Sequence, residues 1–434
     1  MQLAKNLKIA RLFRKDIALN LIKLLYHKEA VQAMSLYISM FVGILLGFGV
    51  SIVNTRLLGP QWYGDLKFLT NLFTFVAVIT TFGFFYTGGK LLAWQKDEHI
   101  KKELIGGLLI ISSIISLLVI FILFIFSFFI DDLFHQQGLG KIIRLFSPLL
   151  LVFPFKICLE NIMQGDNRIF LLAIFQRASH ILYLMGALTV SYIFSFSLVI
   201  CLTLQLGFAA LVILIMLLIL KPKVANMRTM LSHIYRENRI YGLHVYVGSL
   251  ANVATAMLMG LFLGYIVDTT EVGFYSLALT ITAPLSFIPS AVGTTLFNKF
   301  ARKPSIPQKA ILVTIGLTVF TLIVFYLLVD KVVLLAYSTA FSKVIPLAYI
   351  AAIGKVLYGF GDFVNRFLGA HGKGEELRNG AFITGASIII GGLIFIPSFG
   401  ALGAVITESI AGGLYCAMMC YYYEKVIKTD ISDR

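Results

Sequence analysis

The sequence predicts an all-α membrane protein whose helices cross the bilayer about twelve times, and three observations lead to this fold class. Hydrophobic residues make up 59% of the 434 residues and charged residues only 13%, whereas a soluble protein carries about 25% charged residues. The mean hydropathy of +0.90 does not suit a soluble protein, which also needs a polar surface. Long apolar runs recur along the chain, and Lys and Arg concentrate in alternate connections between them.

The apolar runs have the length of membrane-spanning helices, which need about 20 mainly apolar residues. Backbone polar groups find no water in the bilayer, so these runs must be helical. The alternating pattern of a membrane β-barrel is absent from the sequence. We place the spans at residues 33–57, 65–88, 104–130, 142–163, 169–193, 198–220, 242–267, 273–298, 310–330, 343–368, 379–396 and 400–423.

The distribution of Lys and Arg predicts the orientation of the chain. With the N-terminus in the cytoplasm, the connections on that side hold 26 Lys and Arg residues, and the opposite loops hold three. Those three are Lys141, Lys331 and Lys343. We therefore expect both termini in the cytoplasm. The net charge of +15 then faces anionic lipid and requires no nucleic-acid partner.

The spans and the polar segments divide the chain into five parts. In residues 1–32, Ile9 and Phe13 recur at helical spacing among basic residues, which predicts a basic amphipathic segment on the cytoplasmic membrane surface. The alternative for this segment is a solvated tail. The other parts are an N-lobe of six helices, a basic cytoplasmic linker, a C-lobe of six helices and a cytoplasmic tail. They cover residues 33–220, 221–241, 242–423 and 424–434.

Two short matches indicate an internal repeat. The turn at residues 59–64 corresponds to 268–275, and the helix end at 161–165 corresponds to 365–369, with similar offsets. Because six is an even number, both copies would point the same way, as in transporters with parallel repeats. Such transporters place the substrate site between the two lobes, near the middle of the bilayer.

Ten ionisable residues lie inside the predicted spans, where each costs about 2.5–3.5 kcal/mol at a helix centre. Seven of them are basic and three are acidic, so pairing leaves an excess of positive charge. This excess predicts a cavity for an anionic group such as a phosphate. The ten are Arg56, Lys67, Arg144, Lys156, Glu160, Arg177, Lys355, Asp362, Arg366 and Glu408.

Depth and helix face decide which of these residues we assign to the cavity. Lys67, Arg144 and Arg366 stand near predicted helix ends, where snorkelling to the interface explains a charge. Spacing of seven and four places Lys355, Asp362 and Arg366 on one helix face. Lys156 and Glu160 also share a face, and both helices are the fourth of their half. We predict that substrate-binding residues of the cavity are Arg56, Lys156, Arg177, Lys355 and Arg366.

Carboxylates inside a membrane have a second use, because they can load and release a proton or hold Na⁺. We assign ion coupling to Asp362, Glu408 and Glu160. The alternative for Asp362 is a structural ion pair with Lys355 or Arg366. The sequence contains no HExxH, no P-loop and no CxxC spacing, so we expect neither a metal site nor a bound ATP.

Residues 54–64, with the sequence NTRLLGPQWYG, carry a resemblance to a known family. A first helix that ends in Arg-x-Leu-Gly-Pro-x-x-Tyr-Gly resembles the polysaccharide flippases of the multidrug/oligosaccharidyl-lipid/polysaccharide exporter superfamily. The resemblance implies a MATE-like fold of two six-helix lobes around a central cavity. Only Arg56 is assigned to the cavity by the motif itself, and Tyr265 stands opposite it in the second half.

The resemblance also implies a function. The cargo would be an oligosaccharide repeat unit, such as O-antigen, on undecaprenyl pyrophosphate. The protein would flip it from the cytoplasmic to the outer leaflet of the bacterial inner membrane by alternating access. It would need no cofactor apart from H⁺ or Na⁺ as a coupling ion. Its partners would be membrane lipids and polysaccharide assembly proteins, namely a polymerase and a chain-length regulator.

Two other function classes remain as alternatives. A multidrug or cation antiporter of the same superfamily would need a cavity richer in carboxylates than the ten charges indicate. A polytopic glycosyltransferase or polysaccharide polymerase would present catalytic residues on a large outside loop. The largest outside loops expected here are short, at 131–141 and 331–342.

Overall fold

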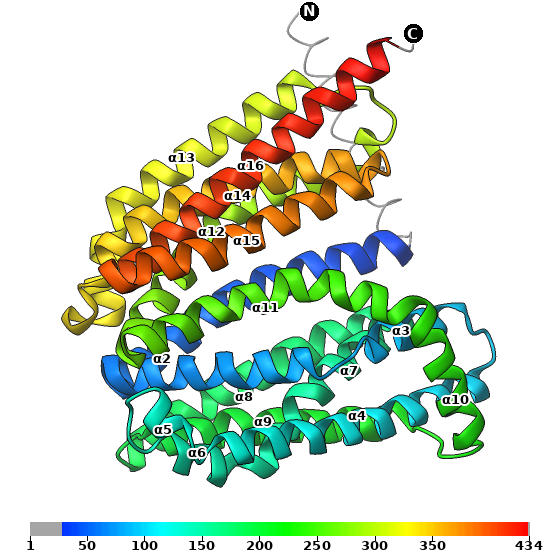
Figure 1. Cartoon of the computed structure of the whole chain (residues 1–434), viewed down its shortest axis with the longest axis vertical. Coiled ribbons are helices and arrows are strands. Elements are labelled where there is room, and N and C mark those ends of the chain that lie inside the picture. Colours follow the sequence, from blue (N-terminus) through cyan, green and yellow to red (C-terminus); the bar gives the residue numbers. More distant parts are fainter. Residues whose placement is uncertain (1–27, 433–434) are drawn as a thin grey trace, which may run out of the picture.

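The structure is a computed structural model that describes residues 28–432, and within that range the backbone is helical with short connections and no strand (Figure 1). The first half comprises α2 (Lys28–Ile79), α3 (Phe84–Trp94), α4 (Glu98–Phe126), α5 (Ile130–Leu133), α6 (Leu139–Phe146), η1 (Ser147–Leu151), α7 (Val152–Gly165), α8 (Ile169–Ile193) and α9 (Leu198–Leu220). The connection and second half comprise α10 (Met227–Glu237), η2 (Asn238–Gly242), α11 (Leu243–Ile266), α12 (Thr269–Phe300), α13 (Gln308–Val332), η3 (Val333–Tyr337), η4 (Thr339–Phe341), α14 (Val344–Ala370), α15 (Gly374–Phe399) and α16 (Ala401–Ser432). The predicted all-α class is confirmed.

The helices account for about twelve passes through a membrane. Ten helical stretches of the described chain are long and apolar enough to span, and the first of them, Ile38–Ile79, has 42 residues. At 1.5 Å per residue it is about 63 Å long, roughly twice the thickness of the hydrocarbon core. It is two passes, because the backbone turns back within it. With the first stretch counted as two passes, the ten stretches give eleven. Helix α11, whose apolar part is Met257–Ile266, completes the twelve.

The turn inside α2 follows from two residues of the sequence motif. Gly59 has φ 70° and ψ 179°, a conformation that only glycine adopts without strain. Pro60 follows at the first position of the next helix, where its fixed φ and missing N–H are tolerated. The second pass therefore begins at Pro60 and not at residue 65. It ends at Ile79 and continues, after a break at Phe82 and Gly83, in α3.

The passes form two bundles (Figure 1). The first bundle holds α2 to α9, and the second holds α12 to α16, in which α14 packs on α12 and α16. Helix α11 contacts both α2 and α15, and α12 also packs on α2. The start of α2, helix α10 and the end of α16 lie at one end of the molecule. We name this the α10 end, and the opposite end, where α5 and η3 lie, the η3 end.

The polar segments differ in part from the prediction. Of the predicted N-terminal amphipathic segment, residues 1–27 lie outside the described residues. The connection 221–241 contains the helix α10, which is fixed to the first bundle by an ion pair of 3.4 Å between Lys90 and Glu237. In the predicted tail 424–434, α16 continues as a helix to Ser432.

Candidate substrate cavity

A cavity of about 920 Å³ lies against the second bundle and is bordered by α2 and α11. Its walls carry charged, hydroxyl, amide and aromatic side chains. The α2 residues Lys67 and Asn71 line it from the first bundle, and Leu377 and Arg378 at the start of α15 line it toward the α10 end. The cavity is therefore shared by both bundles, and it combines charged and polar groups with an apolar lining.

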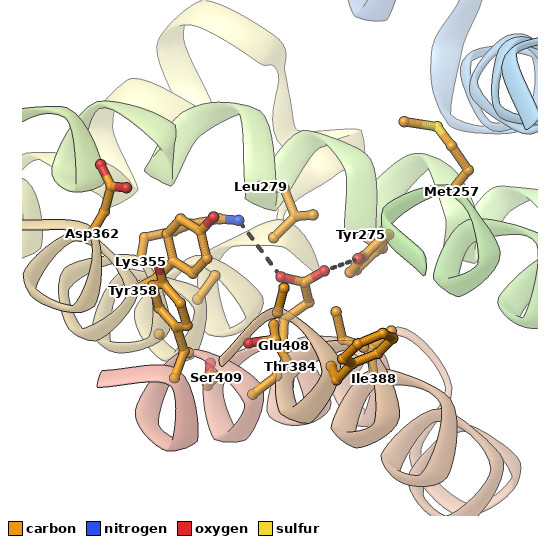
Figure 2. A pocket seen from close by; sticks show the side chains of 18 of the residues that line it. Met257, Tyr275, Leu279, Lys355, Tyr358, Asp362, Thr384, Ile388, Glu408 and Ser409 are labelled. Atoms are coloured by element: carbon orange, nitrogen blue, oxygen red, sulfur yellow. Dashed lines mark hydrogen bonds and ion pairs between the residues drawn. The ribbon is translucent and has the colours of Figure 1, made fainter. Parts of the chain in front are cut away.

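One set of polar contacts on the cavity wall joins three helices (Figure 2). Lys355 of α14 lies 3.6 Å from Glu408 of α16. The hydroxyl of Tyr275, on α12, donates a hydrogen bond of 3.0 Å to the other carboxylate oxygen of Glu408. The side chains of Lys355 and Glu408 are 24% and 18% exposed. Both predicted residues therefore reach the cavity, as an ion pair at its wall.

A second ion pair lies about two to three turns further along α14. The Arg366 guanidinium is 3.3 Å from the Asp362 carboxylate, and Ser290 of α12 also donates to that carboxylate. Asp362 lines the cavity. Arg366 keeps its Nε buried and without a hydrogen-bond partner in the described structure. The structure thus contains the ion pair that the sequence left open as the alternative role of Asp362.

Lys67 and Arg378 are cavity cations that were not among the predicted substrate-binding residues, and Lys67 lies deep within a spanning helix. It lies seven residues beyond Pro60, about 10 Å along the helix, and lines the cavity. Among residues 28–432 it has no carboxylate partner, and its Nζ lies 5.3 Å from the centre of the Tyr63 ring. Snorkelling does not describe this position. The signal that could have found it was the motif, since Gly59 and Pro60 fix where the second pass begins.

Lys156 and Glu160 line a different cavity. It has a volume of about 390 Å³ and lies inside the first bundle, between α2, α7, α8 and α9. His180 and Gln205 also line it, and His180 Nδ1 and Gln205 Oε1 are buried without a hydrogen-bond partner in the described structure. The two charged α7 and α14 faces are therefore walls of two cavities, not of one.

Arg177 points toward the first pass of α2. Its Nε donates a hydrogen bond of 3.2 Å to the Ser39 hydroxyl, and its guanidinium lies against Gly43. Arg177 lines neither of the two cavities. Its predicted role in substrate binding therefore has no support from either cavity.

Arg56 lies against η3 and lines neither cavity. Its Nε donates a hydrogen bond of 2.7 Å to the carbonyl of Ala336, and its Nη2 donates to the carbonyl of Leu335. These carbonyls belong to η3, a π-helical turn that ends α13. The residue that the motif assigned to the cavity therefore ties the first bundle to the second through backbone acceptors.

The η3 end is closed by direct contact between the bundles. A side chain at Gly64 would collide with the backbone of Thr269, and one at Gly273 would collide with Gly64. The Thr269 hydroxyl donates a hydrogen bond of 2.5 Å to the Asp65 carboxylate. The two turns that matched in the sequence repeat are thus packed on each other. They leave the bundles joined at this end.

Charged side chains of both signs line the main cavity. Lys67, Lys355 and Arg378 line it together with the carboxylates of Asp362 and Glu408, and both carboxylates already have cationic partners. Positive charge is therefore in excess. Residues 28–432 contain no group of three His, Cys, Asp or Glu side chains that could hold a metal ion.

Solved structures of transporters share this fold. A lipid II flippase, MurJ, in an inward closed conformation matches with a TM-score of 0.70 and 15% identity, over 89% of this chain and 87% of that one. An inward-facing multidrug resistance MATE transporter of the MOP superfamily matches with a TM-score of 0.68 and 15% identity, over 92% and 98% of the two chains. An outward-facing MATE transporter of the same superfamily matches with 0.56 and 15% identity, over 94% and 98%. All three share the fold of this chain at low sequence identity.

Comparison by sequence gives the family. No curated protein matches the chain. A family described as polysaccharide biosynthesis protein matches residues 31–303, from the first pass of α2 through α12. That match covers more than half of the sequence and includes both turns of the η3 end, so the chain belongs to the family of polysaccharide biosynthesis proteins.

Proposed function

We propose that the protein moves an oligosaccharide linked to undecaprenyl pyrophosphate from the cytoplasmic to the outer leaflet of the membrane. The observation that carries the proposal is the cavity of about 920 Å³ with excess positive charge, lined from both bundles. Membership of the polysaccharide biosynthesis family supports a saccharide cargo. The shared fold with MurJ, a lipid II flippase, supports a lipid-linked one.

The cavity cations suit a diphosphate. Lys67 has no carboxylate partner among the described residues and is free to meet an anion, whereas Lys355 must exchange Glu408 for a phosphate oxygen. Charge-assisted hydrogen bonds to phosphate are about twice as strong as neutral ones. They would replace the water that a diphosphate loses on entering about 30 Å of hydrocarbon. The prenyl tail would stay among the lipid chains, because its hydrocarbon is already solvated there and gains little by entering a cavity with charged walls.

Alternating access follows from the two ends of the molecule. The lysine and arginine bias predicts that the α10 end faces the cytoplasm. The cavity extends to that end at Arg378, while Arg56, Gly64 and Gly273 close the η3 end. In this arrangement the cargo would enter from the cytoplasmic leaflet. Release to the outer leaflet would require the contacts at the η3 end to separate.

An inward gradient of H⁺ or Na⁺ would drive the cycle. Asp362, Glu408 and Glu160 are the carboxylates that line the two cavities. A coupling cation would bind to the empty carrier when it faces outward and leave when it faces the cytoplasm. Collapse of both gradients should then stop net transport in wild type, and E408Q should weaken the dependence on the gradient. Transport unaffected by collapsing the gradients would reject coupling.

The cellular setting belongs to the same proposal. The protein would act in the inner membrane of a bacterium, with both termini in the cytoplasm. It would supply O-antigen or similar repeat units for lipopolysaccharide or another surface polysaccharide. A polymerase and a chain-length regulator would act on the translocated units. The protein itself would make and break no bond in the cargo.

Reconstitution tests the proposed function. Purified protein in liposomes would receive undecaprenyl pyrophosphate that carries a labelled oligosaccharide, and a membrane-impermeant glycosidase would report label on the outside. Wild type should expose the label faster than empty liposomes, and K67A should expose it about tenfold to a hundredfold more slowly than wild type. K141A is the matched control, because Lys141 is an exposed lysine outside both cavities. Export of a cationic dye without flipping of the labelled lipid would favour the multidrug antiporter instead.

A further inference from the structure

An exposed tyrosine stands between the two ion pairs of α14. Tyr358 is 43% exposed although it lies within a membrane-spanning helix, and it lines the main cavity (Figure 2). Its ring is stacked on Tyr415 of α16, with centroids 5.0 Å apart and planes 24° apart. Tyr415 is only 7% exposed. Tyr415 therefore covers one face of the Tyr358 ring, and the exposed part of Tyr358 lines the cavity.

Small residues hold the ring pair in place. The Tyr415 ring lies against the backbone of Gly361, where any side chain would collide with it. Gly412 faces the Cβ of Tyr358, and Gly354 lies against the backbone of Ser409. These close approaches of α14 and α16 fix the position of the two rings before any ligand binds. A preformed flat surface loses less entropy on binding than a mobile one.

Two residues with hydrogen-bonding side chains, Asp362 and Asn365, follow Tyr358 on α14 and also line the cavity. Asp362 lies one turn along α14 from Tyr358 and is 17% exposed, so its carboxylate retains acceptor capacity toward the cavity. The Asn365 amide also lines the cavity, where it hydrogen-bonds Tyr415 and lies 3.9 Å from the Met419 sulfur through Nδ2. A pyranose ring has an apolar face of C–H groups and a rim of hydroxyls. A flat aromatic ring flanked by a carboxylate and an amide offers partners for both.

The position of the ring relative to the cations identifies which sugar it meets. Lys355 precedes Tyr358 by three residues, which is one turn of α14, or about 5 Å. In a lipid-linked oligosaccharide the diphosphate is bonded directly to the first sugar. A diphosphate held at Lys355 and Lys67 would therefore leave that first sugar beside Tyr358.

From this geometry we infer that the Tyr358 and Tyr415 pair, with Asp362 and Asn365, is the binding site for the sugar that is bonded to the diphosphate. The inference rests on the proposed function and extends it to a sugar subsite. Tyr358 supplies the contact surface and Tyr415 positions it. The site binds a pyranose through its shape and hydroxyl rim and does not require a charged sugar.

Soluble probes test the sugar site in the purified full chain. The bare probe is citronellyl diphosphate, and the sugar probes are the same molecule bonded to glucose, galactose, N-acetylglucosamine or N-acetylgalactosamine. Titration calorimetry gives the affinity of each. In wild type at least one sugar probe should bind about two- to tenfold more tightly than the bare probe, the range expected of aromatic stacking.

Variants assign that gain to the ring. Y358A should lose the gain and keep the affinity for bare diphosphate, which also shows that it is folded. Y358F should keep most of the gain. Y192A is the matched control, because Tyr192 is 93% exposed on α8 and lies outside the cavity, and it should bind as wild type does.

The outcomes separate the two proposals. Binding of the bare diphosphate with no gain from any sugar would overturn the sugar site and leave the proposed function intact. Equal loss of affinity for both kinds of probe in Y358A would also overturn it. Failure of wild type to bind any probe would contradict the diphosphate site of the proposed function. It would also contradict the sugar site, which depends on that diphosphate site.

Discussion

Helices α7 and α14 are the fourth spanning helices of their halves, and they use similar charges in different surroundings. Lys156 and Glu160 of α7 line a cavity of about 390 Å³ enclosed by helices of the same bundle. Lys355 and Asp362 of α14 line a cavity of about 920 Å³ that is also bordered by α2 of the other bundle. Equivalent positions in a repeat therefore do not carry equivalent roles. The neighbours of a charged helix decide whether its charges meet a large ligand.

The largest expected effect is on the rate of flipping, and it distinguishes the roles of α7 and α14. K355A should lower the rate of flipping in liposomes about tenfold to a hundredfold, because a hydrogen bond to a charged group contributes about 1.5–3 kcal/mol. K67A should have an effect of the same size. K156A should lower the rate less, because Lys156 lies in the smaller cavity. Equal losses in K156A and K355A would show that the two helices serve one site after all.

A second prediction concerns the η3 end, where the halves meet symmetrically. G64A and G273A should hinder its closure, because the added Cβ meets backbone atoms of the other half. We expect a loss of flipping of about tenfold or less, since a small shift of the backbone relieves part of the clash. Cysteine labelling from the η3 end measures whether it has opened. G47A is the matched control, with no atom within 4 Å of the added Cβ, and should behave as wild type.

Arg56 allows a finer test of the same end. R56A removes two hydrogen bonds to the carbonyls of Leu335 and Ala336, so the η3 end should label several-fold faster while binding of citronellyl diphosphate stays unchanged. A loss of diphosphate binding in R56A, with normal labelling, would instead support the role in substrate binding that the sequence motif predicts for Arg56.

The smallest expected effect concerns stability. Asn238 is 2% exposed, accepts a hydrogen bond of 2.9 Å from Thr87 and donates one of 3.0 Å to the carbonyl of Phe82. N238A leaves these partners unpaired and should cost about 1–3 kcal/mol, seen as a lower melting temperature of the purified protein. E424A should change it little, because the Glu424 and Lys428 pair is 70% and 79% exposed. Equal melting temperatures for N238A and wild type would contradict the assigned contacts.

The fold followed from local signals, whereas the site depended on tertiary neighbours. Apolar runs and the Gly59–Pro60 turn were sufficient for about twelve passes, because bilayer thickness and backbone hydrogen bonding leave few alternatives. Helix face was sufficient to group Lys355 with Asp362. It was not sufficient to show that Lys156 faces its own bundle, or that Arg56 reaches the backbone of η3. The surroundings of Lys156 and Arg56 depend on how the helices pack on one another. The sequence of a single spanning helix does not determine that packing.

Lys67 shows how a small error in a boundary changes an assignment. A predicted span from residue 65 puts Lys67 near a helix end, where snorkelling explains it. The observed start at Pro60 puts it two turns inside the helix and on the cavity wall. The stacked pair of Tyr358 and Tyr415 had no sequence signal as a pair, because the two residues are on different helices.

Photocrosslinking in the membrane tests the central claim most directly, that the cavity receives the lipid-linked head group. Benzoylphenylalanine would replace Phe382, which lines the cavity, or Phe121, which is 62% exposed on α4 outside it. The labelled substrate is undecaprenyl pyrophosphate with a tritiated oligosaccharide, and digestion of the adduct identifies the part that is attached. We predict a saccharide adduct at position 382 and none at position 121. Adding K67A or K355A to the protein labelled at 382 should abolish the adduct. Saccharide adducts at 121 alone, or adducts at 382 that persist in both lysine variants, would contradict it.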